Sequence, residues 1–179
     1  MEEVPPIDEL DALVADAFVR ALAPLFEGAS AFAARLALDR PFGSYRALLD
    51  RARVVALAMP ESEQIALLDA HPRIGASPAT VSALSYREQG YDREAAHDRE
   101  APPQLATDLE RLNAAYETRF GFRFVIHVAG RSRAEIARLL LEEHLSPDRE
   151  EEKHRALRDV VAIAQDRLRL LRGAEEVAR

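Results

Sequence analysis

The sequence predicts an all-α fold: a bundle of about eight helices with one short extended segment near residues 122–128. Two observations indicate this class. Apolar residues recur at spacings of three and four along most of the chain, and only FRFVIHV at 122–128 is rich in β-branched and aromatic residues. One strand cannot form a sheet, so this segment does not change the class. With 179 residues, 48% of them hydrophobic, the chain is expected to be one domain over 1–179.

The first part of the chain is expected to form two helices. An apolar stripe that starts near Asp8 indicates an amphipathic helix that Gly28 ends, with a kink or an early end at Pro24. Ser30 is the expected N-cap of a second, short helix that reaches about Arg40.

Two longer helices are then expected, over 44–59 and 63–70, preceded by Ser44 and Ser62 as candidate N-caps. The second helix should end at His71, because the following proline pushes that residue out of the α region. The imidazole would then project from a helix end into a loop.

After a loop over 72–91 with one or two helical turns, a helix is expected from Pro103 to Gly121. Ser132 and Glu135 form a capping-box pattern that predicts the next helix.

Ser146 and Pro147 are expected to open the last helix, which Gly173 ends. Its first turn includes the run REEEK at 149–153, which is interpreted as solvated.

Composition excludes several classes of function. The chain has 24 Lys plus Arg against 31 Asp plus Glu, a net charge of -7, which argues against generic nucleic-acid binding. It has no cysteine, so disulfides, thiolate nucleophiles and cysteine-based zinc sites are excluded. No apolar run approaches the roughly 20 residues of a membrane span, and the acidic start does not resemble a secretory signal. A cytoplasmic protein without a membrane partner is expected.

Five histidines are candidates for chemistry, and none of them has a metal-ligand spacing. No metal site is therefore expected. Three of them lie in charged stretches typical of a surface, namely His97, His144 and His154. His127 alternates with apolar neighbours and could be the polar face of the extended segment.

His71 differs from the others, because a chain break, a rigid proline and a nearby glycine fix it where a ligand can approach. The sequence leaves two interpretations open: the imidazole is a functional group, or it only caps the preceding helix.

The segment Ser85-Tyr86-Arg87-Glu88-Gln89 is also ambiguous. Ser-x-x-Glu is a capping box, in which case both side chains bind backbone N–H groups. Alternatively, Glu88 turns inward beside His71 to form a general acid–base pair, and Ser85 and Gln89 hold polar ligand atoms.

Arg167 lies on the expected buried stripe of the last helix, because it follows Leu157, Val160 and Ala164 by ten, seven and three residues. A guanidinium that points inward should have an anionic partner, either a protein carboxylate or a ligand carboxylate.

Several segments together resemble one family. They are PLFEGASAFAARLALDRPFGSYRALL at 24–49, HPRIGA at 71–76, SYREQ at 85–89, RLNAAYETRFGFRFVIHVAGRSRAEI at 111–136 and ALRDVVAIAQDRL at 156–168. In order and spacing they are similar to the 2-oxo-4-hydroxy-4-carboxy-5-ureidoimidazoline decarboxylases of urate breakdown. The resemblance covers roughly residues 8–171, and the combination is more specific than any single motif.

The resemblance implies a helical, usually dimeric carboxy-lyase that releases CO₂ from this ureidoimidazoline and forms (S)-allantoin. It places the catalytic groups on His71 and Glu88. No cofactor is needed, because the imidazoline C=N bond of the substrate can accept the electrons that CO₂ leaves behind. The resemblance places substrate contacts on Pro72, Ser85, Tyr86, Arg87, Gln89, Phe124, Val125, Ile126, His127, Val128 and Arg167.

Two residues depart from the family pattern. Arg123 stands where many members have proline, and Ser146 stands where asparagine is frequent. Neither departure removes a proposed catalytic group. The remaining alternatives are a noncatalytic helical domain that binds a ligand or partner, and a decarboxylase of a related heterocycle. A shared pocket for His71 and Glu88 would separate the enzyme from the binding domain.

Overall fold

The computed structural model describes residues 4–92, 103–142, 148–174 and 177. Within these ranges the chain forms nine α-helices, one short 3₁₀ turn (Pro78–Thr80) and no strand. The predicted all-α class is confirmed. The helices are α1 (Ile7–Ala12), α2 (Ala15–Ala21), α3 (Ser30–Ala37), α4 (Tyr45–Ala58), α5 (Glu61–Ala70), α6 (Ala83–Glu88), α8 (Pro103–Phe120), α9 (Arg133–Glu142) and α10 (Arg149–Arg172).

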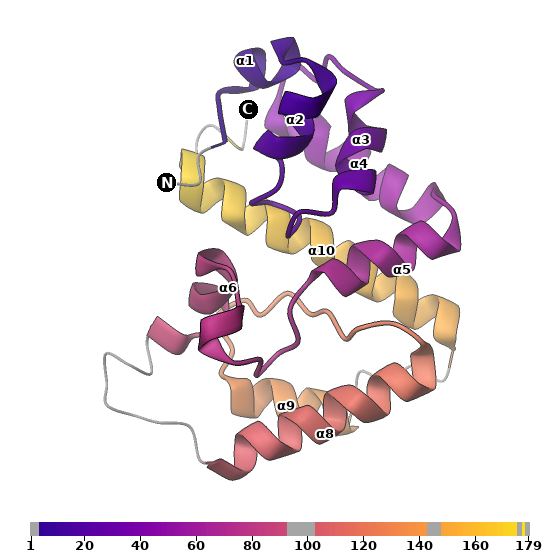
Figure 1. Ribbon diagram of the computed structural model, residues 1–179, viewed down its shortest axis with the longest axis vertical. Coiled ribbons are helices and arrows are strands. Elements are labelled where there is room, and N and C mark those ends of the chain that lie inside the picture. The colour runs from indigo at the N-terminus through magenta and orange to yellow at the C-terminus, as the bar shows by residue number, and fades with distance from the viewer. Residues whose placement is uncertain (1–3, 93–102, 143–147, 175–176, 178–179) are drawn as a thin grey trace.

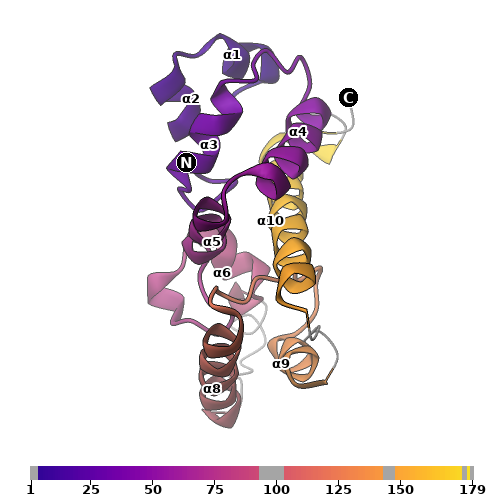
Figure 2. The same ribbon diagram turned by 90° about the vertical axis from the view of Figure 1, so that its right-hand side faces the viewer.

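The long helix α10 runs through the middle of an elongated molecule (Figure 1). Helices α1 to α4 gather at one end, whereas α8 and α9 pack together at the other, as the perpendicular view in Figure 2 also shows. Helix α10 packs against α4 and α5, and Arg149 at its start donates to the Phe120 carbonyl at the end of α8, so it links the two ends. Helix α6 and the loop after α5 lie beside it, between the two groups (Figure 1).

One apolar core runs through the molecule and includes residues from the N-terminal helices, α8, the segment 122–128 and α10. On α10 the buried side chains follow the expected stripe and include Val160, Ala164 and Leu168. The segment 122–128 contributes Phe122, Phe124 and other apolar side chains to the core although it has no partner strand.

The single helix expected from Asp8 is instead two helices, which corrects the prediction. The chain is extended at Leu13 and Val14, between α1 and α2. Tertiary contacts favour this break, because the Arg40 guanidinium donates to the Leu13 carbonyl. The Asp11 carboxylate at the end of α1 accepts from the backbone N–H groups of residues 42 and 43. The bond to the Leu13 carbonyl replaces the one that this carbonyl would accept within a continuous helix.

The expected N-caps agree with the structure in part. Ser44 caps α4 by accepting a hydrogen bond from the Ala47 N–H at 3.1 Å. At Ser30 and Ser62 the prediction is wrong, because the residues at the cap positions are Ala29 and Pro60, which make no side-chain cap bond. Helix α5 begins directly after Pro60, whose φ is -55°.

The capping box before α9 is confirmed, because Ser132 and Glu135 each accept a hydrogen bond from the other's backbone N–H. The last helix begins later than expected, at Arg149. Its N-cap is Asp148, whose carboxylate accepts from the N–H groups of Glu150 and Glu151 at 2.7 and 3.1 Å. Ser146 and Pro147 lie outside the described residues.

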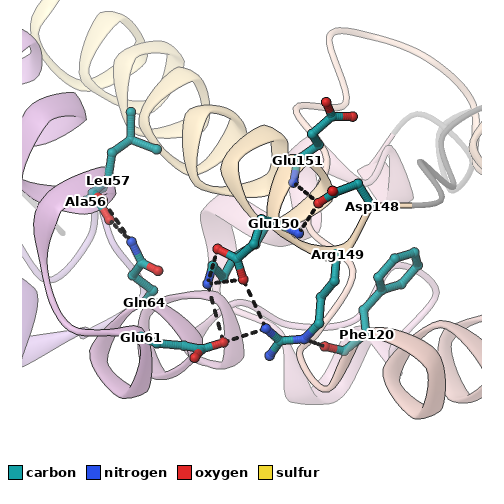
Figure 3. Close-up of polar contacts among 10 residues, drawn as sticks. Ala56, Leu57, Glu61, Gln64, Phe120, Asp148, Arg149, Glu150 and Glu151 are labelled. Atoms are coloured by element: carbon teal, nitrogen blue, oxygen red, sulfur yellow. Dashed lines mark hydrogen bonds and ion pairs between the residues drawn. The ribbon is translucent and has the colours of Figure 1, made fainter.

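The start of α10 is anchored to two other helices, which corrects its interpretation as a solvated run (Figure 3). Arg149 donates to the Phe120 carbonyl at the end of α8 and also pairs with Glu61 at the start of α5. Glu152 and Lys153, expected in solvent, are buried. Lys153 is bound by the carboxylates of residues 61 and 150.

Candidate active site

A cavity of about 240 Å³ lies beside α10, between the loop after α5, helix α6 and the segment that follows α8. It is lined by His71, Pro72, Ile74, Ser85, Arg87, Glu88, Gln89, Phe124, Val125, Ile126, His127, Val128, Ala129, Gly130, Ile163, Asp166 and Arg167. His71 and Glu88 therefore share one cavity, which is the arrangement that distinguishes an enzyme from a noncatalytic domain.

His71 is the C-cap of α5 and is 3% exposed. Its Nδ1 lies 3.1 Å from the Leu67 carbonyl, one turn earlier in the helix. Because a carbonyl only accepts, Nδ1 carries the proton and Nε2 is left with a free lone pair. Nε2 is buried and has no hydrogen-bond partner in the described part of the chain. The imidazole therefore caps the helix with one nitrogen and leaves the other available to a ligand.

The environment of His71 favours the neutral imidazole. Burial and the positive charge of Arg167 lower its pKa to about 4, although the Leu67 carbonyl and the charge of Glu27 oppose this shift. At neutral pH Nε2 is therefore a proton acceptor.

The loop after His71 is held by side chains from the end of α6 and from α8. The Gln89 amide accepts from the Gly75 N–H at 2.8 Å and donates to the Arg73 carbonyl at 3.2 Å. Asn113 donates to the Ile74 carbonyl at 2.9 Å. Gln89 lines the cavity, and these bonds show that its amide also fixes the loop.

Helix α6 resolves the ambiguity of the Ser85–Gln89 segment. Its N-cap is Ser82, which accepts from the Ser85 N–H, so the capping box of Ser85 and Glu88 is not formed. The Ser85 hydroxyl instead donates to a Glu27 oxygen at 2.6 Å. Both Ser85 and Glu88 thus turn toward the cavity and α10.

Arg167 occupies the buried position on α10 that the apolar stripe predicts, and its side chain is 1% exposed. Its Nε and one Nη donate to the two oxygens of Glu88 at 2.6 and 2.7 Å, a bidentate pair. The same Nη donates to Glu27 at 2.6 Å, and the other Nη donates to the Pro24 carbonyl at 2.9 Å. Burial lowers the pKa of Arg167, but the carboxylates outweigh it and the net shift is upward.

Glu27 is the functional candidate that sequence reasoning missed. It lies in the turn after α2, and its carboxylate binds Arg167, Ser82 and Ser85. Burial raises the pKa of Glu27, but the charge of Arg167 and these hydrogen bonds lower it below the usual value. No motif connects it to residues more than 50 positions away, and the only local signal was the helix-ending Gly28.

The wall formed by residues 124–128 is attached to α10 at two places. Arg155 donates to the Val125 carbonyl at 3.0 Å, and the Nε2 of His127 lies 2.6 Å from an Asp166 oxygen. His127 is therefore part of the cavity wall and forms a specific pair, rather than serving as the mere polar face of a strand.

A family profile described as OHCU decarboxylase matches residues 11–169. The chain belongs to the OHCU decarboxylase family. The 2-oxo-4-hydroxy-4-carboxy-5-ureidoimidazoline decarboxylase of Mus musculus is 32% identical over 164 residues, which cover 88% of this chain and 87% of the relative. The enzyme of that name from Haloferax volcanii is 31% identical over 90% of this chain and 93% of the relative.

The chain also matches part of a longer protein, the uric acid degradation bifunctional protein PucL of Bacillus subtilis, at 32% identity over 90% of this chain. It spans about a third of the length of that relative, 32%. A similar protein of Bacillus sp. is 29% identical, and the chain covers 31% of its length.

Two solved structures share the fold. A crystal structure of OHCU decarboxylase in the presence of (S)-allantoin has a TM-score of 0.64 at 21% identity, with 84% of this chain and 96% of the other covered. A crystal structure of (S)-allantoin synthase has a TM-score of 0.65 at 18% identity, with 92% and 53% covered.

Of the site residues that the resemblance to OHCU decarboxylases implies, all line the cavity except Tyr86. The Tyr86 ring packs against Tyr91 instead, with ring centroids 5.3 Å apart. Because Ser85, Glu88 and Gln89 are three and four residues apart, they share the face of α6 that meets the cavity. Sequence reasoning did not include Ile74, Ala129, Gly130, Ile163 and Asp166 in the lining.

The two expected catalytic groups of the family are each held by a different partner. In the described ranges no hydrogen bond joins Glu88 to His71. Leu67 orients the imidazole, and Arg167 holds the carboxylate.

Arg123, which departs from the family pattern, donates to the His71 carbonyl at 2.9 Å, and its backbone N–H donates to Asp69. This side chain therefore ties the wall segment to the end of α5, a bond that proline could not make.

The same ranges hold no cluster of three His, Asp or Glu side chains that could bind a metal ion. None of the helices described combines the length and the apolar character needed to cross a bilayer.

Proposed function

We propose that this protein decarboxylates 2-oxo-4-hydroxy-4-carboxy-5-ureidoimidazoline to (S)-allantoin, without an added cofactor, as a step of urate degradation. The observation that carries this proposal is the buried, unpartnered Nε2 of His71 in the same cavity as Glu88 and Arg167. A neutral, buried base is suited to moving a proton on a bound heterocycle.

The reaction requires the carbon–carbon bond to the carboxylate to break. CO₂ leaves, its bonding pair forms a C=C bond between two ring carbons, and the electrons of the C=N bond move onto the ring nitrogen, which takes a proton from solvent. A ring carbon is then protonated as the neighbouring hydroxyl loses its proton and becomes a carbonyl. Nε2 of His71 can accept the hydroxyl proton and return a proton to carbon, because the imidazole is neutral at the start. Delivery from one side of a fixed cavity would produce a single enantiomer.

The other groups of the cavity have supporting roles in this proposal. Glu88 is the second catalytic group, and Arg167 fixes its carboxylate. Ser85, Arg87 and the backbone of residues 124–128 would hold the polar atoms of the substrate, and Pro72 would limit its position.

The test is to measure CO₂ release and the chirality of allantoin from freshly generated substrate, with wild type and His71→Ala under the same conditions. We expect rapid formation of (S)-allantoin by wild type and its loss in the variant. Racemic product at the spontaneous rate from wild type would overturn the proposal and favour a binding domain. Turnover of only another carboxylated heterocycle would favour the related decarboxylase.

We further propose that the chain is one domain that acts in the cytoplasm as a homodimer, without nucleic-acid or membrane partners. The net charge of -7 and the absence of cysteine support this setting. Support for the dimer comes from the family resemblance. Light scattering during size-exclusion chromatography should give twice the chain mass of 19.9 kDa.

A further inference from the structure

Two carboxylates bind Arg167, and their contacts differ. Glu88 uses both oxygens on Arg167, which is its sole bonded partner within the described residues. Glu27 uses one oxygen to accept three bonds, from Arg167, Ser85 and Ser82, at 2.6, 2.6 and 2.9 Å. Glu27 therefore joins the turn after α2 to both α10 and the start of α6, whereas Glu88, which belongs to α6, joins that helix to α10 only.

Glu27 is also the more enclosed of the two carboxylates. Its side chain is 12% exposed and that of Glu88 is 27% exposed. Glu27 does not line the cavity, although two of its partners, Arg167 and Ser85, do. It therefore lies behind the groups that face a ligand.

The backbone at Glu27 has a φ of 50°, in the left-handed region that non-glycine residues rarely adopt. Such a conformation costs free energy and persists only where the surroundings determine it. Here the three hydrogen bonds to its carboxylate, and the bond from Arg167 to the nearby Pro24 carbonyl, fix the turn.

The donors of Arg167 show what Glu27 contributes. A guanidinium has five N–H groups in a rigid fork. The Glu88 carboxylate accepts from Nε and from one Nη. The same Nη also donates to Glu27 and Ser85, and the other Nη donates to the Pro24 carbonyl. Glu27 and the Pro24 carbonyl are the two acceptors that the turn after α2 offers to the guanidinium. Without Glu27, the bond to the neutral Pro24 carbonyl would remain.

We propose that Glu27 is a positioning residue of the active site. It fixes the guanidinium of Arg167 and the hydroxyl of Ser85 in the orientation that they present to the cavity, and it does not itself touch the substrate. The inference rests on the proposed function and names a residue that this function needs. The negative charge of Glu27 also raises the pKa of His71, whereas the positive charges of Arg167 and Arg123 lower it.

The test compares Glu27→Gln, Glu27→Asp and a control, Glu63→Gln. Glutamine keeps the size of the side chain and removes its charge. The control removes the carboxylate charge from another Glu–Arg pair, the bidentate pair of Glu63 with Arg35, away from the cavity. The thermal unfolding of each variant is measured first, and activities are then compared at a temperature at which every variant is folded.

Under those conditions we expect Glu27→Gln to lower kcat by about a hundredfold with a smaller change in KM, because displaced groups of a cavity lose mainly transition-state contacts. Glu27→Asp keeps the charge and should recover at least a tenth of wild-type kcat. Glu63→Gln should remain within twofold of wild type. A folded Glu27→Gln variant with wild-type kcat and KM, or one that loses only thermal stability, would overturn the proposal.

A second readout does not depend on turnover. Rotation of the Arg167 guanidinium exchanges its two Nη resonances, which NMR can measure after assignment with Arg167→Lys. Exchange should be slow in wild type and faster in Glu27→Gln, and equal exchange in the two proteins would contradict the proposal. If wild type fails to decarboxylate the substrate, the proposed function is wrong. The rate of Nη exchange then tests by itself whether Glu27 positions Arg167.

Discussion

His71 shows how one side chain can end a helix and also provide a reactive atom. Its Nδ1–H binds the Leu67 carbonyl, which would otherwise lack a partner at the end of α5. That bond selects the tautomer whose Nε2 is free. The two interpretations that the sequence left open are therefore compatible, because they concern different nitrogens of the same ring.

The buried state of His71 predicts a pH dependence of stability. Its pKa is lowered from 6.5 to about 4 on folding, so between these values the unfolded chain binds more protons than the folded chain. The contribution of the neutral imidazole is thus fully present above about pH 6.5 and is lost as pH falls toward 4. Two and a half pKa units correspond to about 3 kcal/mol.

The measurement is the free energy of unfolding of wild type and His71→Asn between pH 7 and pH 4. We expect wild type to lose more stability than the variant over this interval. The lowered pKa of Glu27 contributes only below its ordinary value of 4.5, so it does not mask the effect at higher pH. Parallel curves for the two proteins would contradict the interpretation.

Gly75 provides a prediction about the loop that follows His71. Its φ is +82°, and a Cβ added there would lie 2.9 Å from Leu109 Cδ1 and 3.1 Å from Leu109 Cβ. Gly75→Ala should lower the free energy of unfolding by about 1–3 kcal/mol, through backbone strain and contact with α8. Gly43→Ala is the control, because Gly43 has a φ of +68° with open space around it. Equal losses in urea denaturation would show that the close contact has no effect.

At the level of elements, Arg155 connects α10 to the cavity wall and to α8. It binds the Val125 carbonyl, Glu152 and Asp159. Tyr116 of α8 donates to the same Glu152 at 2.7 Å, and burial together with this carboxylate raises the pKa of Tyr116 above its usual range. Arg155 thereby holds the irregular segment 122–128 on α10, and Glu152 holds α8 on the same helix.

Removal of Arg155 should destabilise the protein. In Arg155→Met the Glu152 carboxylate, whose side chain is 1% exposed, would keep only the Tyr116 hydroxyl as a partner. The expected loss is about 3 kcal/mol, because a buried charge is left without its counter-ion. Arg158→Met, at an exposed position of the same helix, should change stability by less than about 0.5 kcal/mol. Similar chemical denaturation midpoints for the two variants would contradict the role of the cluster.

On the scale of the whole molecule, α10 makes the two ends of the bundle depend on each other. Its inner face lies in the common core, so a cavity there should affect the entire chain. Leu168→Ala should lower the free energy of unfolding by about 2–5 kcal/mol in one cooperative transition. Leu168 is fully buried, whereas Leu170, the matched control, is 51% exposed.

The measurement follows urea unfolding by circular dichroism and by tyrosine fluorescence, since the chain has four tyrosines and no tryptophan. Coincident transitions are expected for Leu168→Ala, and Leu170→Ala should unfold like wild type. Two separate transitions would show that the ends of the bundle unfold independently.

The sequence predicted elements well where local chemistry decides them. The Ser132–Glu135 box, the Ser44 cap and the break at His71-Pro72 each depend on residues within four positions. The inward position of Arg167 followed from the period of the helix. The sequence did not reveal the break at Leu13, because the bond from Arg40 that accompanies it comes from the loop between α3 and α4, 27 positions along the chain.

By itself, the sequence determined the helical class and the burial of Arg167, since periodicity encodes which residues share a face. Most of the cavity lining was implied by the resemblance to the OHCU decarboxylases. Only the tertiary structure decided which partners these groups have. Glu88 binds Arg167, Glu27 reaches the same guanidinium from the turn after α2, and Nε2 of His71 has no partner among the described residues. Each of these facts depends on distances between segments far apart in the chain. Burial and charge act through space, so these contacts leave no local pattern in the sequence.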